Sequence, residues 1–111
     1  MNKVKPIVIK DNENNQEYTL EFDRDAVRFA ESRGFKLADI DDFPMTKVPE
    51  FFWYAFRMHH KSVALNKAEE ILRQIGGLTT PIAQRMVDLW NQTYDSLGNE
   101  EEKNPNMTVE I

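Results

Sequence analysis

The start of the chain alternates between apolar and polar positions, and this pattern predicts a β-hairpin. The first strand is the β-branched run 6–9, and a polar stretch separates it from the second strand at 17–22. Side chains of a strand point alternately to opposite faces, so the second strand has a buried face and a wet face, with Glu21 on the wet one. Two strands alone are marginal in water, so either the following helices cover the apolar face or another copy extends the sheet. That face consists of Tyr18, Leu20 and Phe22.

Helical signals begin directly after the second strand. Asp23 is placed to cap a helix and Gly34 to end it in a left-handed conformation, which predicts a helix from about Arg24 to Arg33. Phe35 then folds back onto the last turn. Apolar residues three apart at 37–43 are interrupted by aspartates, so this segment forms a turn or a single short helix.

The segment from Thr46 to about Ser62 predicts a helix with aromatic residues around most of its circumference. Thr46 is its candidate cap, and Pro49 then falls in the first turn, where a missing donor costs little. At 3.6 residues per turn, two adjacent rows form the face that packs on the core. These rows contain Phe51, Ala55, Met58 and Ser62, and Phe52, Phe56, His59 and Val63.

Four residues of this helix fall outside the core rows and are the candidate partner-binding site: Trp53, Tyr54, Arg57 and His60. Trp, Tyr and Arg are the usual anchors of protein interfaces, so this side of the helix predicts a protein-binding surface. One alternative stays open. Other elements of the same chain could cover the helix on both sides, and the four residues would then be structural.

Two further helices complete the pattern. Asn66 and Glu69 form a capping box at the start of a helix that Gly76-Gly77 ends. Thr80-Pro81 opens the last helix, and Gly98 stops it. The buried stripe of the last helix is Ile82, Met86, Leu89, Trp90, Thr93 and Leu97.

These elements predict an α+β fold that is mainly α, with an N-terminal β-hairpin followed by four or five helices in a small bundle. Residues 1–98 form a single domain, since 111 residues support one core. Residues 99–111 contain an acidic run and a proline without periodicity, which predicts a disordered acidic tail.

Composition excludes several classes of function. The net charge of −5 opposes binding to nucleic acid, and the absence of cysteine excludes disulfides, thiolate metal sites and a cysteine nucleophile. The apolar run near the start is too short for a signal peptide or a membrane segment, so we expect a cytoplasmic protein without membrane contact.

The candidate metal sites in the sequence do not meet the requirements for binding an ion. The loop after Asp11 has a calcium-like spacing, but it lacks the glycine at the sixth position and the glutamate at the twelfth. His59 and His60 are adjacent and point about 100° apart on a helix, so they cannot chelate one ion as a pair. His59 completes a core row, and His60 is solvated or touches a partner. We therefore expect no enzyme, no catalytic residues, no cofactor and no metal.

Three segments carry a resemblance to a known family: YTLEFDRDAVRFAESRGF at 18–35, PEFFWYAFRMHHKSVALNKAEEIL at 49–72 and GGLTTPIAQRMVDLWNQTYDSL at 76–97. Taken in order, they resemble the small tail assembly chaperones of long-tailed bacteriophages of Gram-positive hosts. The resemblance implies a non-enzymatic protein of the bacterial host cytoplasm. It implies binding of the tape measure protein, whose hydrophobic helices it keeps soluble, and recruitment of tail tube protein.

A second class of function stays open, namely a small acidic phage or prophage regulator or inhibitor that binds a host protein. Such a protein needs a continuous acidic face, whereas the acids here are dispersed or lie in the tail. Self-association is a further possibility because a two-stranded sheet has exposed edges.

Overall fold

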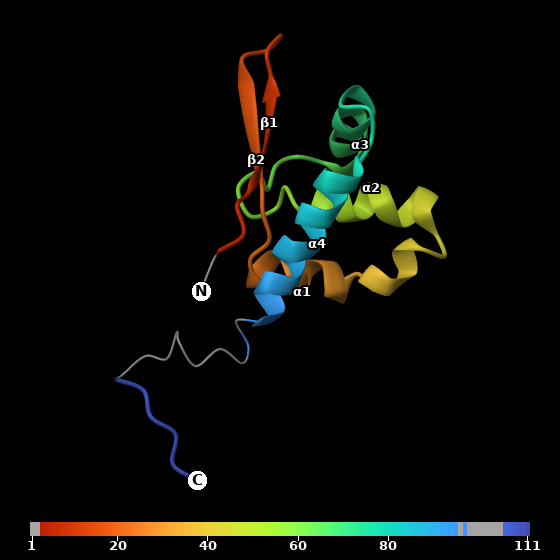
Figure 1. Ribbon diagram of the computed structural model, residues 1–111. Helices are drawn as coiled ribbons and strands as arrows, with labels where there is room; N and C mark the ends of the chain where they lie inside the picture. Colours follow the sequence, from red (N-terminus) through yellow and green to blue (C-terminus); the bar gives the residue numbers. More distant parts are fainter. Residues whose placement is uncertain (1–2, 96, 98–105) are drawn as a thin grey trace.

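A two-stranded hairpin stands beside a group of helices in the computed structural model, which describes residues 3–95, 97 and 106–111 (Figure 1). The fold is α+β and mainly α, as predicted. The hairpin precedes four α-helices and one short 3-10 helix. In chain order the elements are β1 (Ile7–Asp11), β2 (Gln16–Leu20), α1 (Arg24–Ser32), η1 (Leu37–Ile40), α2 (Pro44–Tyr54), α3 (Leu65–Gln74) and α4 (Thr80–Asp95).

The hairpin pairs β1 and β2 antiparallel, with Ile7 opposite Leu20 and Asp11 opposite Gln16. Asp11 holds the turn together because its Oδ1 accepts the amides of Glu13 and Asn14 at 3.1 and 3.2 Å. Asn15 closes the turn with φ 52°, a left-handed conformation that asparagine tolerates well. The predicted hairpin is confirmed, and β2 ends at Leu20, two residues earlier than expected.

Helix α1 is built as predicted at both ends. Asp23 accepts the amide of Ala26 at 2.8 Å, which satisfies one of the free donors of the first turn. Gly34 has φ 84°, and its amide and that of Phe35 bond back to the carbonyls of Glu31 and Ala30. This is the Schellman arrangement of a helix C-terminus, and it directs Phe35 into the core.

The boundaries predicted for the aromatic helix are wrong. Helix α2 begins at Pro44, where the missing amide of proline costs nothing, and Thr46 does not cap it. Pro49 consequently lies inside the helix instead of in its first turn. The helix ends at Tyr54, and the chain continues to His59 in turns.

The last two helices differ slightly from prediction. Asn66 lies inside α3 because the helix begins at Leu65, with Ala64 as the residue before it. Gly76 and Gly77 end α3 with φ 85° and 88°, as predicted.

Helix α4 begins at Thr80, one residue before the expected proline start, and the hydroxyl of Thr79 accepts the amide of Ile82 at 3.4 Å. Leu97 follows the helix and is 70% exposed, so it does not extend the buried stripe. The predicted stop at Gly98 lies outside the described residues.

Four aromatic rings contributed by distant segments form the centre of the core. Phe51 of α2 is stacked between Phe22 and Phe35, with ring centroids 5.4 and 5.8 Å away. Trp90 of α4 meets all three rings edge-on at 5.2 to 5.7 Å. Such edge-on and offset contacts add stability beyond that of the buried area alone. The cluster joins α2, α4 and the segments on either side of α1.

Glu21 is a correction to the predicted hairpin, because it is buried instead of facing water. Since β2 ends at Leu20, strand alternation no longer applies at this position. The Glu21 carboxylate lies 3.0 Å from Nε2 of His59 and 3.8 Å from Nζ of Lys3. His59 is exposed and pairs with this acid, so it does not complete a core row.

Residues 106–111 are exposed and contain no helix or strand. The rest of the predicted disordered tail, 99–105, lies outside the described residues, so disorder stays a prediction. None of the helices in the described ranges has the length and apolar character needed to cross a membrane.

Candidate functional site

The structure brings the four predicted partner-binding residues together, although α2 ends before two of them. Trp53, Tyr54, Arg57 and His60 line one small hollow of about 20 Å³, which is roughly the space of a single water molecule. The remaining wall comes from α1 and from the chain that follows α2, through Phe29, Lys61 and Val63.

Trp53 is anchored within its own chain. Its indole Nε1 donates to the carbonyl of Val63 at 2.8 Å, which fixes the turn between α2 and α3 onto the end of α2. Its ring meets Phe29 edge-on at 5.8 Å, and the guanidinium of Arg33 lies 5.3 Å from the ring centroid. The side chain is half-buried, and its one polar atom is already used.

Arg57 links the end of α2 to α1. Its guanidinium carbon lies 3.9 Å above the centre of the Phe29 ring, and its Nε donates to Asp25 at 3.1 Å. The planar guanidinium therefore stacks on an aromatic face and pairs with a carboxylate at the same time, a combination that lysine cannot reproduce.

Tyr54 and His60 also serve the fold. Tyr54 is 1% exposed and packs edge-on against Phe29 and Phe35, so the prediction that it faces a partner is wrong. His60 accepts the backbone amide of Thr19 through Nε2 at 2.9 Å and covers the outer edge of β2. Burial and the neighbouring His59 lower the pKa of His60 below its usual value of 6.5, which favours the neutral accepting form.

These contacts favour the alternative in which other elements of the chain cover the aromatic segment. Partner binding by Trp53, Arg57 and His60 stays a prediction, and any partner would have to bind over side chains that already hold α1, α2 and β2 together.

A larger opening lies between the hairpin and α3, and the sequence did not indicate it. It is a groove of about 360 Å³. Its apolar lining comes from Ile9 and Tyr18 of the hairpin and from Ile71 and Ile75 of α3. In the described chain, the backbone of the hairpin approaches α4 while α3 packs on α2, which leaves the groove between them (Figure 1). The period-two pattern of β1 and β2 is the sequence signal that could have indicated it, because that pattern predicts an apolar face that another element or a partner must cover.

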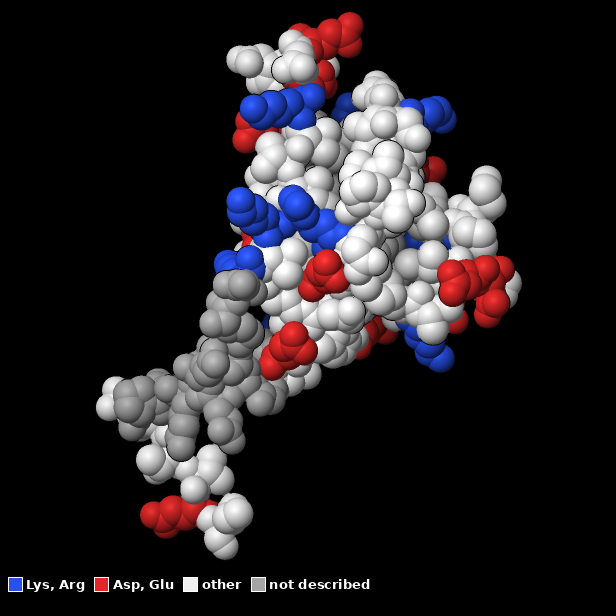
Figure 2. All heavy atoms as spheres, in the orientation of Figure 1, with Lys and Arg blue, Asp and Glu red and all other residues white. Residues whose placement is uncertain are grey.

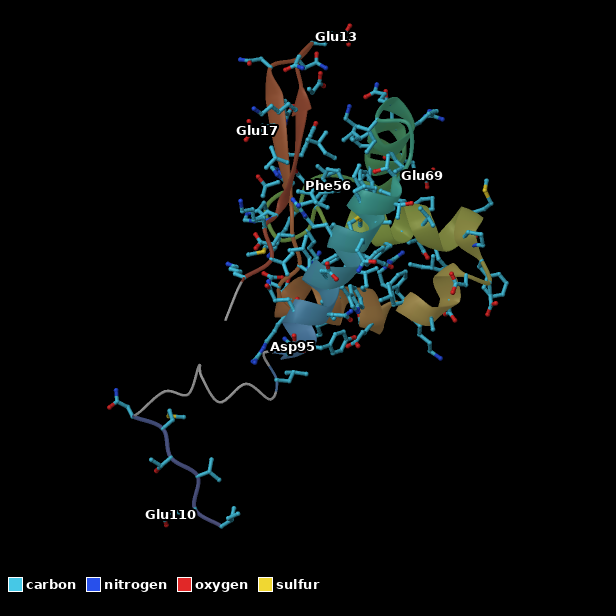
Figure 3. All side chains as sticks on the ribbon, in the orientation of Figure 1. Glu13, Glu17, Phe56, Glu69, Asp95 and Glu110 are labelled. Carbon is cyan, nitrogen blue, oxygen red and sulfur yellow. The ribbon has the colours of Figure 1, made fainter. Side chains whose placement is uncertain are left out.

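Polar groups surround the groove at the tip of the hairpin. Asp11 and Glu13 lie at its rim together with Lys10 and Gln74. The hydrogen bond from the Asn14 side chain lowers the pKa of the Asp11 carboxyl below its usual value, so this carboxylate stays charged. Glu17 and Glu69, by contrast, point away from the groove on opposite sides (Figure 3). The groove is thus an apolar surface with a charged rim at one end.

The described residues contain no group of three or more His, Cys, Asp or Glu side chains that could hold a metal ion. The calcium-like loop is the turn of the hairpin, and Asp11 uses both carboxylate oxygens on Glu13 and Asn14.

Comparison with known proteins gives a family but no function. The family described as "Domain of unknown function (DUF5055)" matches residues 1–111, so the chain belongs to this family. No curated protein and no solved structure matches it.

Proposed function

We propose that this protein is a non-enzymatic tail assembly chaperone of a bacteriophage or prophage, which binds the tape measure protein in the bacterial cytoplasm and helps to recruit tail tube subunits. The resemblance of residues 18–35, 49–72 and 76–97 to that family motivates the proposal. The observation that carries it is the groove between the hairpin and α3.

The groove has the features of a helix-binding surface. Amphipathic helices bind to proteins by laying apolar side chains, spaced three or four residues apart, into an apolar groove. Ile9, Tyr18, Ile71 and Ile75 supply the apolar lining, and the charged rim at the hairpin tip selects the orientation of the bound helix. Ile9 and Ile75 are half-buried, so a partner side chain gains apolar contact without displacing the core.

The test compares neighbouring positions on opposite faces of β1. Ile9→Ser removes an apolar contact from the groove, whereas Val8→Ser makes the same kind of change on the outer face, where Val8 is 48% exposed. Each variant is co-expressed with the tape measure protein of the same genome and recovered by pull-down. We expect Ile9→Ser to reduce capture about tenfold, as for an interface anchor, and Val8→Ser to leave it unchanged.

Thermal melts of both variants separate binding from folding. If Ile9→Ser and wild type capture equal amounts of the tape measure protein, the groove is not the binding site. No capture by the wild-type protein, together with a tape measure gene absent from the neighbouring genes, would remove the chaperone function itself.

A further inference from the structure

Two exposed patches at opposite ends of α2 carry opposite charge. The first, here called the acidic corner, contains Asp41, Asp42 and Phe43 between η1 and α2, and Met45 in the first turn of α2. The second, here called the arginine face, contains Phe29, Arg33, Trp53, Arg57 and Lys61 around the end of α2. We propose that the acidic corner of one copy docks on the arginine face of a second copy.

The acidic corner is an apolar projection with free carboxylates. Phe43 is 61% exposed and Met45 is 90% exposed, which makes them the most exposed large apolar residues between β1 and α4. Asp41 and Asp42 are exposed beside them, and within the described chain neither has an ion-pair partner. Figure 2 shows acidic side chains gathered at this edge of the molecule. Two highly exposed large apolar side chains two residues apart give this corner the character of a contact site.

The arginine face offers the complementary chemistry. Arg33 is exposed and lies over the rings of Phe29 and Trp53 at 5.7 and 5.3 Å, which holds its guanidinium in place. In the part of the chain that the structure describes, Arg33 and Lys61 have no acidic partner, whereas Arg57 is already paired with Asp25. A guanidinium held on an aromatic surface binds a carboxylate with little loss of conformational entropy.

The acidic corner and the arginine face of one molecule are too far apart to contact each other. Helix α2 has 11 residues, so its ends lie roughly 16 Å apart along the axis. Each copy therefore presents both patches to its neighbours, and the contact joins unlike surfaces. The patches are small, so we expect association at protein concentrations of roughly 10–1000 µM, weakened by salt.

Charge exchange between two variants of the full-length chain tests the pairing. The corner variant carries Asp41→Arg and Asp42→Arg, and the face variant carries Arg33→Glu and Lys61→Glu. Each alone opposes like charges across the contact and should associate at least about tenfold more weakly than wild type. In an equimolar mixture each contact between unlike variants joins opposite charges, so the mixture should associate far more strongly than either variant alone. Sedimentation velocity across this concentration range, at low and high salt, measures the association.

A control matched to the corner variant makes the same change in net charge at other positions. Glu17→Arg with Glu69→Arg replaces two exposed acids on the outer sides of the hairpin and α3, and it should associate like wild type. Circular dichroism checks that all variants stay folded. A wild-type protein that stays monomeric at about 1 mM, or a mixture that associates no better than either variant, overturns the proposal. Tape measure capture through the groove is measured separately in the same variants and should not change, so the two proposals fail independently.

Discussion

Replacing Trp53 by phenylalanine should lower the stability of the protein without changing capture of the tape measure protein. The change keeps an aromatic ring against Phe29 but removes the indole donor that bonds the carbonyl of Val63 at 2.8 Å. A hydrogen bond of this kind contributes about 1 kcal/mol net, and a carbonyl left without a partner in a half-buried site raises the cost to about 2 kcal/mol. In a domain of this size, such a loss lowers the melting temperature by roughly 4–12 °C.

A second variant on the same surface sharpens the prediction. Arg57→Lys keeps the positive charge but loses the guanidinium plane that lies 3.9 Å from the centre of Phe29. The ion pair with Asp25 is partly exposed and lysine can still form it, so the expected loss of about 0.5–1 kcal/mol comes from the stacking. Because Trp53 and Arg57 share Phe29, their effects should not add in the double variant.

Urea unfolding followed by far-UV circular dichroism measures these changes, since removing Trp53 leaves only Trp90 as a fluorescent indole. Pull-down of the tape measure protein runs in parallel. Our reasoning is refuted if Trp53→Phe unfolds at the wild-type urea concentration but captures about tenfold less partner. That result would return Trp53 and Arg57 to the partner-binding role that the sequence suggested.

Substitutions at three other positions test the local structure. Gly34→Val should cost about 1–2 kcal/mol of unfolding free energy because φ at this position is 84°. No atom lies within 4 Å of an added Cβ, so the penalty is backbone strain alone. Gly34→Asn should cost clearly less, and equal losses for the two variants would contradict this explanation. Asp23→Ala should cost about 1 kcal/mol through the lost bond to the Ala26 amide, while a melt of Asp23→Asn should stay close to wild type. Burial lowers the pKa of His60, so the unfolded chain binds a proton first and stability should fall as the pH drops below 6.5. Urea midpoints of His60→Gln, which cannot titrate, should show a weaker fall over the same range, and an identical profile would exclude this residue as a cause.

The parts of the fold that the sequence predicted are those with local causes. The hairpin follows from alternation over a few residues, and α1 follows from a side-chain cap at Asp23 and a left-handed stop at Gly34. Each signal acts between residues at most five positions apart, so no knowledge of the remaining chain was needed.

The end of α2 has a distant cause, and for that reason the sequence pattern missed it. In a continuing helix the carbonyl of Ala55 would accept the amide of His59. It instead accepts the amide of Glu21 at 3.0 Å, from the residue directly after β2. From Ala55 to Arg57, the backbone amides bond to carbonyls three residues back, and the bond from a segment 34 positions away takes a carbonyl that a longer helix would need. No glycine, proline or capping residue marks the position.

The sequence placed Tyr54 wrongly because a helical projection does not show which other elements cover each side of the helix. Helical rows project every residue from Thr46 to Ser62 onto one cylinder, on which Tyr54 points away from the core. Helix α1 packs on this side of α2, and Tyr54 contacts Phe29 and Phe35 there. The aromatic excess of the segment therefore serves a helix that contacts α1, η1 and α3 at once. An aromatic circumference on a helix is consequently evidence of many neighbours, and only the structure decides whether those neighbours belong to the same chain.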